Sequence, residues 1–193
     1  MSTEDLNEPA SQSDNQVDER DLARRASSGD RRAFAALYDL HVEAVYRYAY
    51  FRLRTQAEAE DVTSEVFHRA LVAMPRYEPR RPFLAFLYTI ARNVVTDRMR
   101  RQRPEASYED ALTHPSDAPG PDELAVTSDD ARRLRSAIAR LTPLQQDVIV
   151  LRFLGDRSTP EIAAVIGKPE STIRGIQMRA LAALRKLLGE VSL

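Results

Sequence analysis

Basic and aromatic side chains alternate in the segment Met74–Pro82 (MPRYEPRRP), which its prolines should hold as a loop. The residues of interest there are Arg76, Tyr77, Arg80 and Arg81. Aromatic rings stack on bases and guanidinium groups neutralise phosphates, so this set suits single-stranded nucleic acid. Taken alone, the pattern fits a core aromatic surrounded by solvated arginines better.

The helix expected after this loop, Phe83–Arg103, has a polar face and an apolar face. Helical spacing puts Thr89, Arg92, Asn93 and Thr96 on the polar side. The apolar stripe consists of Phe83, Leu87, Ile90 and Val94. We expect this helix to bury the stripe and to leave the polar face free for a ligand.

A helix-turn-helix is predicted near the C-terminus. A short helix over Thr159–Ile166 stops at Gly167, Lys168-Pro169 makes the turn, and a last helix runs from about Glu170 to Leu188. In this arrangement the start of the second helix enters the DNA major groove. The candidate DNA-binding residues are Lys168, Glu170, Ser171, Thr172, Arg174, Gly175, Met178 and Arg179.

Local signals along the rest of the chain favour helices and no strands. Capping boxes start at Thr55, Thr142 and Ser158, each with Glu or Gln three residues later. Gly29-Asp30 separates a short helix from a long one that reaches about Arg54. The prediction is an all-α protein with two small helical domains.

Charge is sorted along the chain into four blocks, although the formal net charge is only −1. Residues 1–19 carry six acids and no base, and residues 104–130 carry eight acids and no base. Residues 20–103 and 131–193 are both basic. Two basic helical blocks joined by an acidic, Pro-rich linker look like two modules that each face a polyanion. The first block should be a disordered tail.

Composition argues against several classes of protein. The sequence has no cysteine, three scattered histidines and no Gly-rich phosphate loop or metal-ligand spacing. We therefore expect no catalytic residues, metal or cofactor, and no enzyme activity. The N-terminus is unlike a secretory signal, and no apolar run approaches the roughly 18 residues of a membrane helix. A cytoplasmic protein without membrane insertion is predicted.

Three segments, in this order, resemble extracytoplasmic-function sigma factors, the small two-domain members of the sigma-70 family of bacterial transcription initiation factors. They are Ala59–Ala70 (AEDVTSEVFHRA), Phe83–Arg101 (FLAFLYTIARNVVTDRMRR) and Leu141–Leu188. The resemblance implies sigma region two over residues 20–103 and region four over residues 131–193. Its implied function is to direct promoter-specific initiation by RNA polymerase.

The resemblance also implies partners and roles. RNA polymerase core would bind through its β′ clamp helices and β flap, and an anti-sigma factor would be a further partner. The clamp helices would contact Asp61, Ser64, Glu65 and Arg69. The Arg76–Arg81 loop would hold a base flipped from the minus-ten element, with the polar face of the next helix beside it. The last helix would read the minus-thirty-five element as duplex, and the acidic linker would run toward the RNA exit path.

The last helix departs from the family pattern. A Val-Lys/Arg-Ser-Arg-Leu run is usual there, whereas this chain has Ile173-Arg174-Gly175-Ile176-Gln177. Gly175 should cost about 1 kcal/mol of helix propensity relative to Ala. Phe86 stands where a tryptophan is common. The fold should persist, but the departure leaves minus-thirty-five specificity open.

Two other functions fit part of the sequence. A helix-turn-helix regulator that binds an operator as a dimer would explain the C-terminal segment but not Ala59–Arg101. A protein that binds only other proteins would show no DNA binding even with polymerase present.

Overall fold

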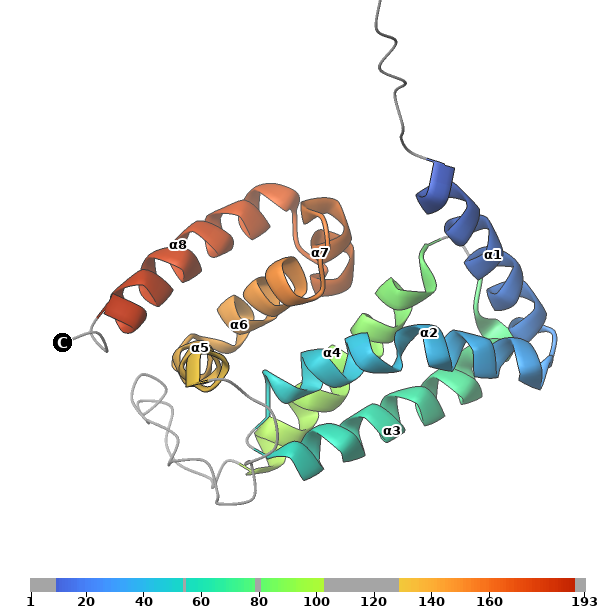
Figure 1. Cartoon of the computed structure of the whole chain (residues 1–193), viewed down its shortest axis with the longest axis horizontal. Helices are drawn as coiled ribbons and strands as arrows, with labels where there is room; N and C mark the ends of the chain where they lie inside the picture. The colour runs from blue at the N-terminus through green and yellow to red at the C-terminus, as the bar shows by residue number, and fades with distance from the viewer. Residues whose placement is uncertain (1–9, 54, 79–80, 103–128, 190–193) are drawn as a thin grey trace, which may run out of the picture.

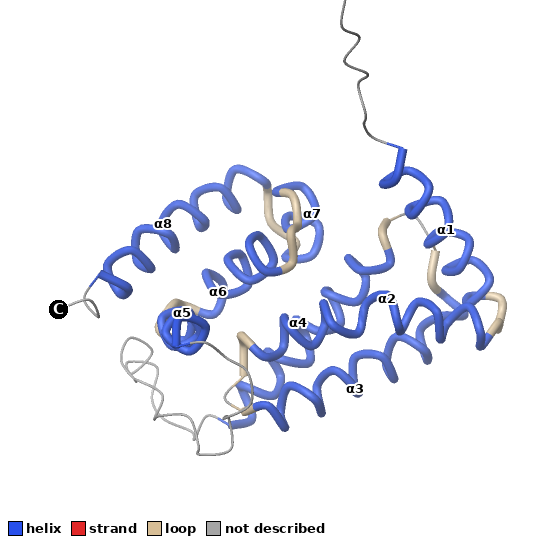
Figure 2. Tube along the Cα trace, viewed as in Figure 1, coloured by secondary structure: helices blue, strands red, loops and turns tan. Residues whose placement is uncertain are grey.

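A computed structural model of the chain describes residues 10–53, 55–78, 81–102 and 129–189. All regular structure in these residues is helical, as Figure 2 shows and as the sequence predicts. The predicted linker, apart from its last two residues, lies outside the described part of the chain.

The described residues of the first half form four α-helices. They are α1 (Ala10–Ser27), α2 (Arg31–Tyr50), α3 (Gln56–Ala73) and α4 (Phe83–Gln102), with a 3-10 turn, η1 (Met74–Arg76), after α3. Gly29 adopts φ +94° between α1 and α2, a conformation that favours glycine. The side chain of Asp30 then caps α2 by accepting hydrogen bonds from two backbone N–H groups. The predicted break at Gly29-Asp30 is confirmed.

Helix α1 begins earlier than predicted. Residues 10–19 are helical, so the prediction of an unstructured tail over residues 1–19 is wrong for this part, and residues 1–9 are not described. A tertiary contact explains part of the difference: Glu19 at the edge of the predicted tail accepts a hydrogen bond from the backbone N–H of Phe83, 64 residues away. Composition does not reveal such a contact.

The second half contains α5 (Asp129–Ala139), α6 (Pro143–Ile149), a π-helical turn η2 (Val150–Leu154), α7 (Thr159–Ile166) and α8 (Glu170–Gly189). All three predicted capping boxes are present, at Thr55, Thr142 and Ser158. Gly167 ends α7 in the left-handed conformation, with φ +74°. The helix-turn-helix elements therefore have the predicted boundaries.

The two halves pack together rather than standing apart. Buried apolar residues from both halves form one continuous core, and α7 packs against α4 (Figure 1). Helix α4 is consequently covered on more than its predicted apolar stripe. Tyr88, which lies outside that stripe, is only 1% exposed, whereas Ile90 within it is half-buried.

Candidate promoter and polymerase interfaces

The start of α4 is held in place by α1. Oε1 of Glu19 accepts the Phe83 N–H at 2.8 Å, satisfying a backbone donor that the helix itself leaves unpaired. The ring of Phe83 is buried, and its centroid lies 5.9 Å from that of His41. Burial lowers the pKa of His41, although Oε2 of Glu19 lies 3.6 Å from its Nε2. These contacts fix the point at which the basic loop enters α4.

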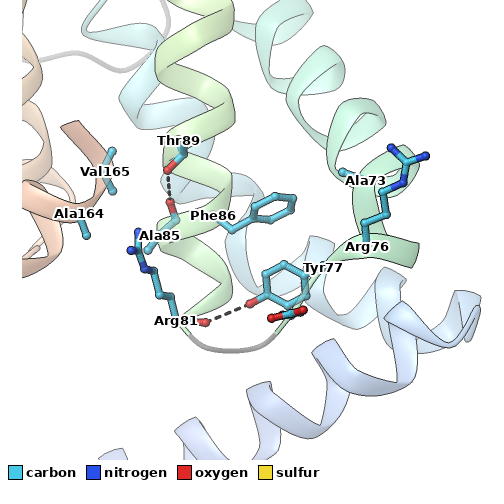
Figure 3. Close-up of a pocket in the computed structure, with 10 residues that line it drawn as sticks. Ala73, Arg76, Tyr77, Arg81, Ala85, Phe86, Thr89, Ala164 and Val165 are labelled. Atoms are coloured by element: carbon cyan, nitrogen blue, oxygen red, sulfur yellow. Dashed lines mark hydrogen bonds between the residues drawn. The ribbon is translucent and has the colours of Figure 1, made fainter. Parts of the chain in front are cut away.

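An aromatic pocket lies beside this point. Tyr77 and Phe86 are half-buried, and their ring centroids are 4.9 Å apart. The Tyr77 hydroxyl donates to the carbonyl oxygen of Arg81 at 3.0 Å, which closes the loop on itself (Figure 3). Burial raises the pKa of Tyr77 to about 12, so the hydroxyl keeps its proton. The pocket has a volume of about 450 Å³.

The pocket walls come from both halves of the molecule. Arg76 and Arg81 lie on opposite sides of the two rings in Figure 3, and both are exposed. Ala164 and Val165 of α7 form the wall beyond Arg81. The structure therefore brings Arg76, Tyr77 and Arg81 to one pocket; Arg80 lies outside the described residues.

The polar face of α4 is largely free. Thr89, Asn93 and Thr96 are exposed, and the Thr89 hydroxyl donates to the Ala85 carbonyl oxygen at 2.9 Å. Arg92 differs, because its Nε donates to Oδ2 of Asp147 in α6 at 3.0 Å. Three of the four predicted residues are thus accessible, and the fourth is engaged by the other half of the molecule.

Asp147 is the centre of a buried polar cluster that the sequence did not reveal. The Tyr48 hydroxyl donates to Oδ1 of Asp147 at 2.7 Å, and Nε of Arg52 lies 3.0 Å from the same oxygen. Arg52 also donates to the side chain of Gln146. Burial and the negative charge of Asp147 both raise the pKa of Tyr48, which therefore stays a donor. A charged residue directly before the apolar run Val148–Leu151 was the available signal.

The predicted clamp-binding residues form a polar ridge on α3. Asp61, Ser64 and Arg69 are exposed and Glu65 is half-buried. Two ion pairs order the ridge, Asp61 with Arg98 of α4 at 3.1 Å and Glu65 with Arg69. Val72 lies eleven residues after Asp61, which places it on the same face, and it is 69% exposed. This apolar member of the face was not among the predicted residues.

On α8 the predicted DNA-binding side is accessible. Gly175 and Glu170 are half-buried, while the rest of the predicted set is exposed: Lys168, Ser171, Thr172, Arg174, Met178 and Arg179. Ile176 is 5% exposed and packs in the core with Ile173, whereas Gln177 is half-buried at the edge. The unusual Ile176-Gln177 pair therefore leaves the helix with an apolar inner face.

Gly175→Ala is expected to stabilise the protein by about 1 kcal/mol, because alanine favours the helix more than glycine does. The space allows it: a Cβ at Gly175 would lie 3.7 Å from its nearest neighbour, a nitrogen of Arg179. Chemical denaturation measures the change. Gly167→Ala is the control and should destabilise, because φ is +74° there. A Gly175→Ala midpoint at or below that of the unchanged chain would contradict the prediction.

No group of three or more His, Asp or Glu side chains in the described residues is arranged to hold a metal ion. Within the same residues, every helix is too short or too polar to cross a membrane.

Comparison with known proteins identifies the family to which each half of the chain is similar. Residues 37–105 match the family Sigma-70 region 2, and residues 137–186 match Sigma-70, region 4. The chain is 40% identical over 171 residues to the ECF RNA polymerase sigma factor BldN of Streptomyces coelicolor, covering 87% of this chain and 65% of BldN. It is 30% identical over 178 residues to the ECF RNA polymerase sigma factor SigW of Bacillus subtilis, covering 87% of this chain and 95% of SigW.

A solved structure has the same arrangement of helices. CnrH, in a complex with the cytosolic domain of CnrY, superposes with a TM-score of 0.71 and 29% identity, covering 90% of this chain and 98% of that chain. Sequence and fold agree across both halves. The chain therefore belongs to the ECF sigma factors of the sigma-70 family, the non-enzymatic subunits that direct promoter-specific transcription initiation by RNA polymerase.

Proposed function

We propose that this sigma factor divides promoter recognition between its two halves. Residues 20–103 bind polymerase core and the melted minus-ten element, residues 131–193 bind the minus-thirty-five duplex, and the acidic residues 104–130 connect them. The observation that carries the proposal is the pocket of Tyr77 and Phe86, which lies next to the exposed polar face of α4. An aromatic pocket beside hydrogen-bonding side chains suits an unpaired base.

In the minus-ten step, a base leaves the duplex and enters the pocket. Unstacking a base costs a few kcal/mol, and stacking on an aromatic ring returns roughly 1–3 kcal/mol per base. Tyr77 and Phe86 supply the rings, and Arg76 and Arg81 supply positive charge on either side. Thr89 and Asn93 then lie where hydrogen bonds to neighbouring bases can form. Arg92 and Thr96 extend the same face, and Arg80 belongs to the same loop.

In the minus-thirty-five step, α8 enters the major groove by its N-terminal half. Ser171, Thr172 and Arg174 present donors and acceptors that can read base edges. Met178, at 70% exposed, is free to contact a thymine methyl group. Lys168 and Arg179 add phosphate contacts, and Glu170 and Gly175 complete this side of the helix.

Polymerase core binds the α3 ridge formed by Asp61, Ser64, Glu65 and Arg69 through its β′ clamp helices, and region four binds the β flap. An anti-sigma protein is proposed as a further partner because CnrH was solved with the cytosolic domain of CnrY bound. These partners place the protein in the bacterial cytoplasm.

Run-off transcription on a promoter library tests the proposal. Specific transcripts are expected only when both this protein and purified core polymerase are present. A helix-turn-helix regulator would instead bind an operator without core and give no new transcript with it, and that result would overturn the proposal. Core polymerase alone controls for non-specific initiation.

A further inference from the structure

In the described part of the chain, polar contacts made by Arg47, Arg135 and Asp147 connect the two halves. Arg47 of α2 donates to the carbonyl oxygen of Leu154 at 3.3 Å. Arg135 of α5 donates to the carbonyl oxygens of Tyr50, the last residue of α2, and of Leu53 beyond the helix. Its guanidinium lies 4.0 Å from the centre of the Tyr50 ring. The Asp147 cluster lies beside these attachments and is the most deeply buried of them.

The cluster joins region four to two helices of region two. Asp147 is 2% exposed, and its two carboxylate oxygens face Tyr48 of α2, Arg52 in the turn after α2, and Arg92 of α4. A carboxylate held by two guanidinium groups and a hydroxyl is stable in a dry interface only while all the partners stay in place. Contacts of this kind favour one arrangement of the two halves.

This arrangement cannot span a promoter. Elements centred about 10 and about 35 base pairs upstream lie about 85 Å apart on duplex DNA at roughly 3.4 Å per base pair. Thr89 of the minus-ten face and Val165 of the helix-turn-helix line one pocket, and the 20-residue α8 is only about 30 Å long. The two reading surfaces must therefore separate before both elements are bound.

We propose that an intramolecular lock centred on Asp147 holds the free sigma factor closed, and that polymerase core and promoter DNA bind an open state in which Asp147 has left Tyr48, Arg52 and Arg92. The inference rests on the proposed function. In the closed state the Asp147 carboxylate takes the place of a DNA phosphate at Arg92. Opening returns that guanidinium to the minus-ten face.

Tyr88 is a residue whose burial should favour the open state over the closed one. Its hydroxyl is buried and has no hydrogen-bond partner among the described residues, and a Cβ at Gly155 would lie only 2.9 Å from it. A buried hydroxyl without a partner favours the state in which water reaches it. The Tyr48 ring lies 5.7 Å away, yet its hydroxyl is bonded to Asp147. Removing each hydroxyl should therefore shift the equilibrium in opposite directions.

Energy transfer between two dyes on the free protein tests the lock. The chain has no cysteine, so Ala57→Cys in α3 and Ala182→Cys in α8, both exposed positions, take the labels without background. Asp147→Asn should raise the ratio of open to closed molecules roughly ten- to a hundredfold, because charge-assisted hydrogen bonds are lost. Tyr48→Phe should raise it less, and Tyr88→Phe should lower it. Exposed Asp156→Asn is the charge-matched control and should leave the ratio unchanged.

The results separate the lock from the proposed function. Because the energy-transfer measurement needs neither polymerase nor DNA, it tests the lock even if no specific transcript appears in the run-off experiment. Circular dichroism shows whether the Asp147→Asn variant still folds. If that variant is unfolded, the Tyr48→Phe and Tyr88→Phe variants test the lock instead. With core polymerase, the apparent affinity of Asp147→Asn should rise by the same factor as its open fraction. Equal transfer in Asp147→Asn and Asp156→Asn, or shifts of one sign for both tyrosine variants, would overturn the proposal.

Discussion

Asn93→Ala is expected to slow open-complex formation on a duplex promoter by about tenfold or more, and a template with a pre-melted minus-ten bubble should restore most of the rate. Asn93 is exposed on α4 next to the proposed base pocket, so the substitution should leave folding intact. Its side chain would stabilise unpaired bases, and the bubble removes the cost of unpairing. Permanganate footprinting on both templates measures the unpaired thymines.

Upstream variants should behave differently. Arg174→Ala and Arg179→Ala are expected to weaken promoter binding, and a bubble at minus-ten should not rescue them because their contacts are to duplex DNA. Loss of a phosphate contact also makes the salt dependence shallower by about one unit of slope. Arg133→Ala, an exposed arginine of α5 outside the proposed interface, is the control. Equal rescue of Asn93→Ala and Arg174→Ala by the bubble would contradict this division of labour.

The double charge reversal Asp61→Lys with Glu65→Lys is expected to lower the affinity for polymerase core by about tenfold or more. Both residues lie on the proposed α3 ridge, one helical turn apart, and like charges placed in an interface repel the partner. Each also loses a surface ion pair, with Arg98 or Arg69, which costs the fold about 0–1 kcal/mol. Fluorescence titration of labelled protein with core measures the affinity, and circular dichroism checks the fold.

The matched control for this prediction lies on the same helix. Glu60→Lys reverses one charge on another side of α3, where Glu60 is exposed and hydrogen-bonded to Gln56. We expect it to keep core affinity near that of the unchanged chain. If the double reversal binds core as tightly as Glu60→Lys does, the assignment of the ridge to the clamp helices is wrong.

Sequence alone determined the local structure of this protein. Helix starts at Thr55, Thr142 and Ser158 were predictable because a capping box is complete within four residues. The stop at Gly167 was predictable for a similar reason, since one residue supplies the left-handed conformation. The ordered segments that resemble sigma factors also needed no coordinates, and comparison with known proteins confirmed the family.

Tertiary structure decided how the two halves meet. Periodicity shows that α4 has one apolar face, but not that Tyr88 and Arg92 on its other sides meet Gly155 and Asp147. These partners lie far apart in the sequence; Tyr48 and Asp147 are separated by 99 positions. The sequence does not show whether a polar side chain forms its hydrogen bonds with water or with a side chain far away in the sequence. Only the packing of the two halves distinguishes these cases, because the free energy of a buried charge depends on every group around it.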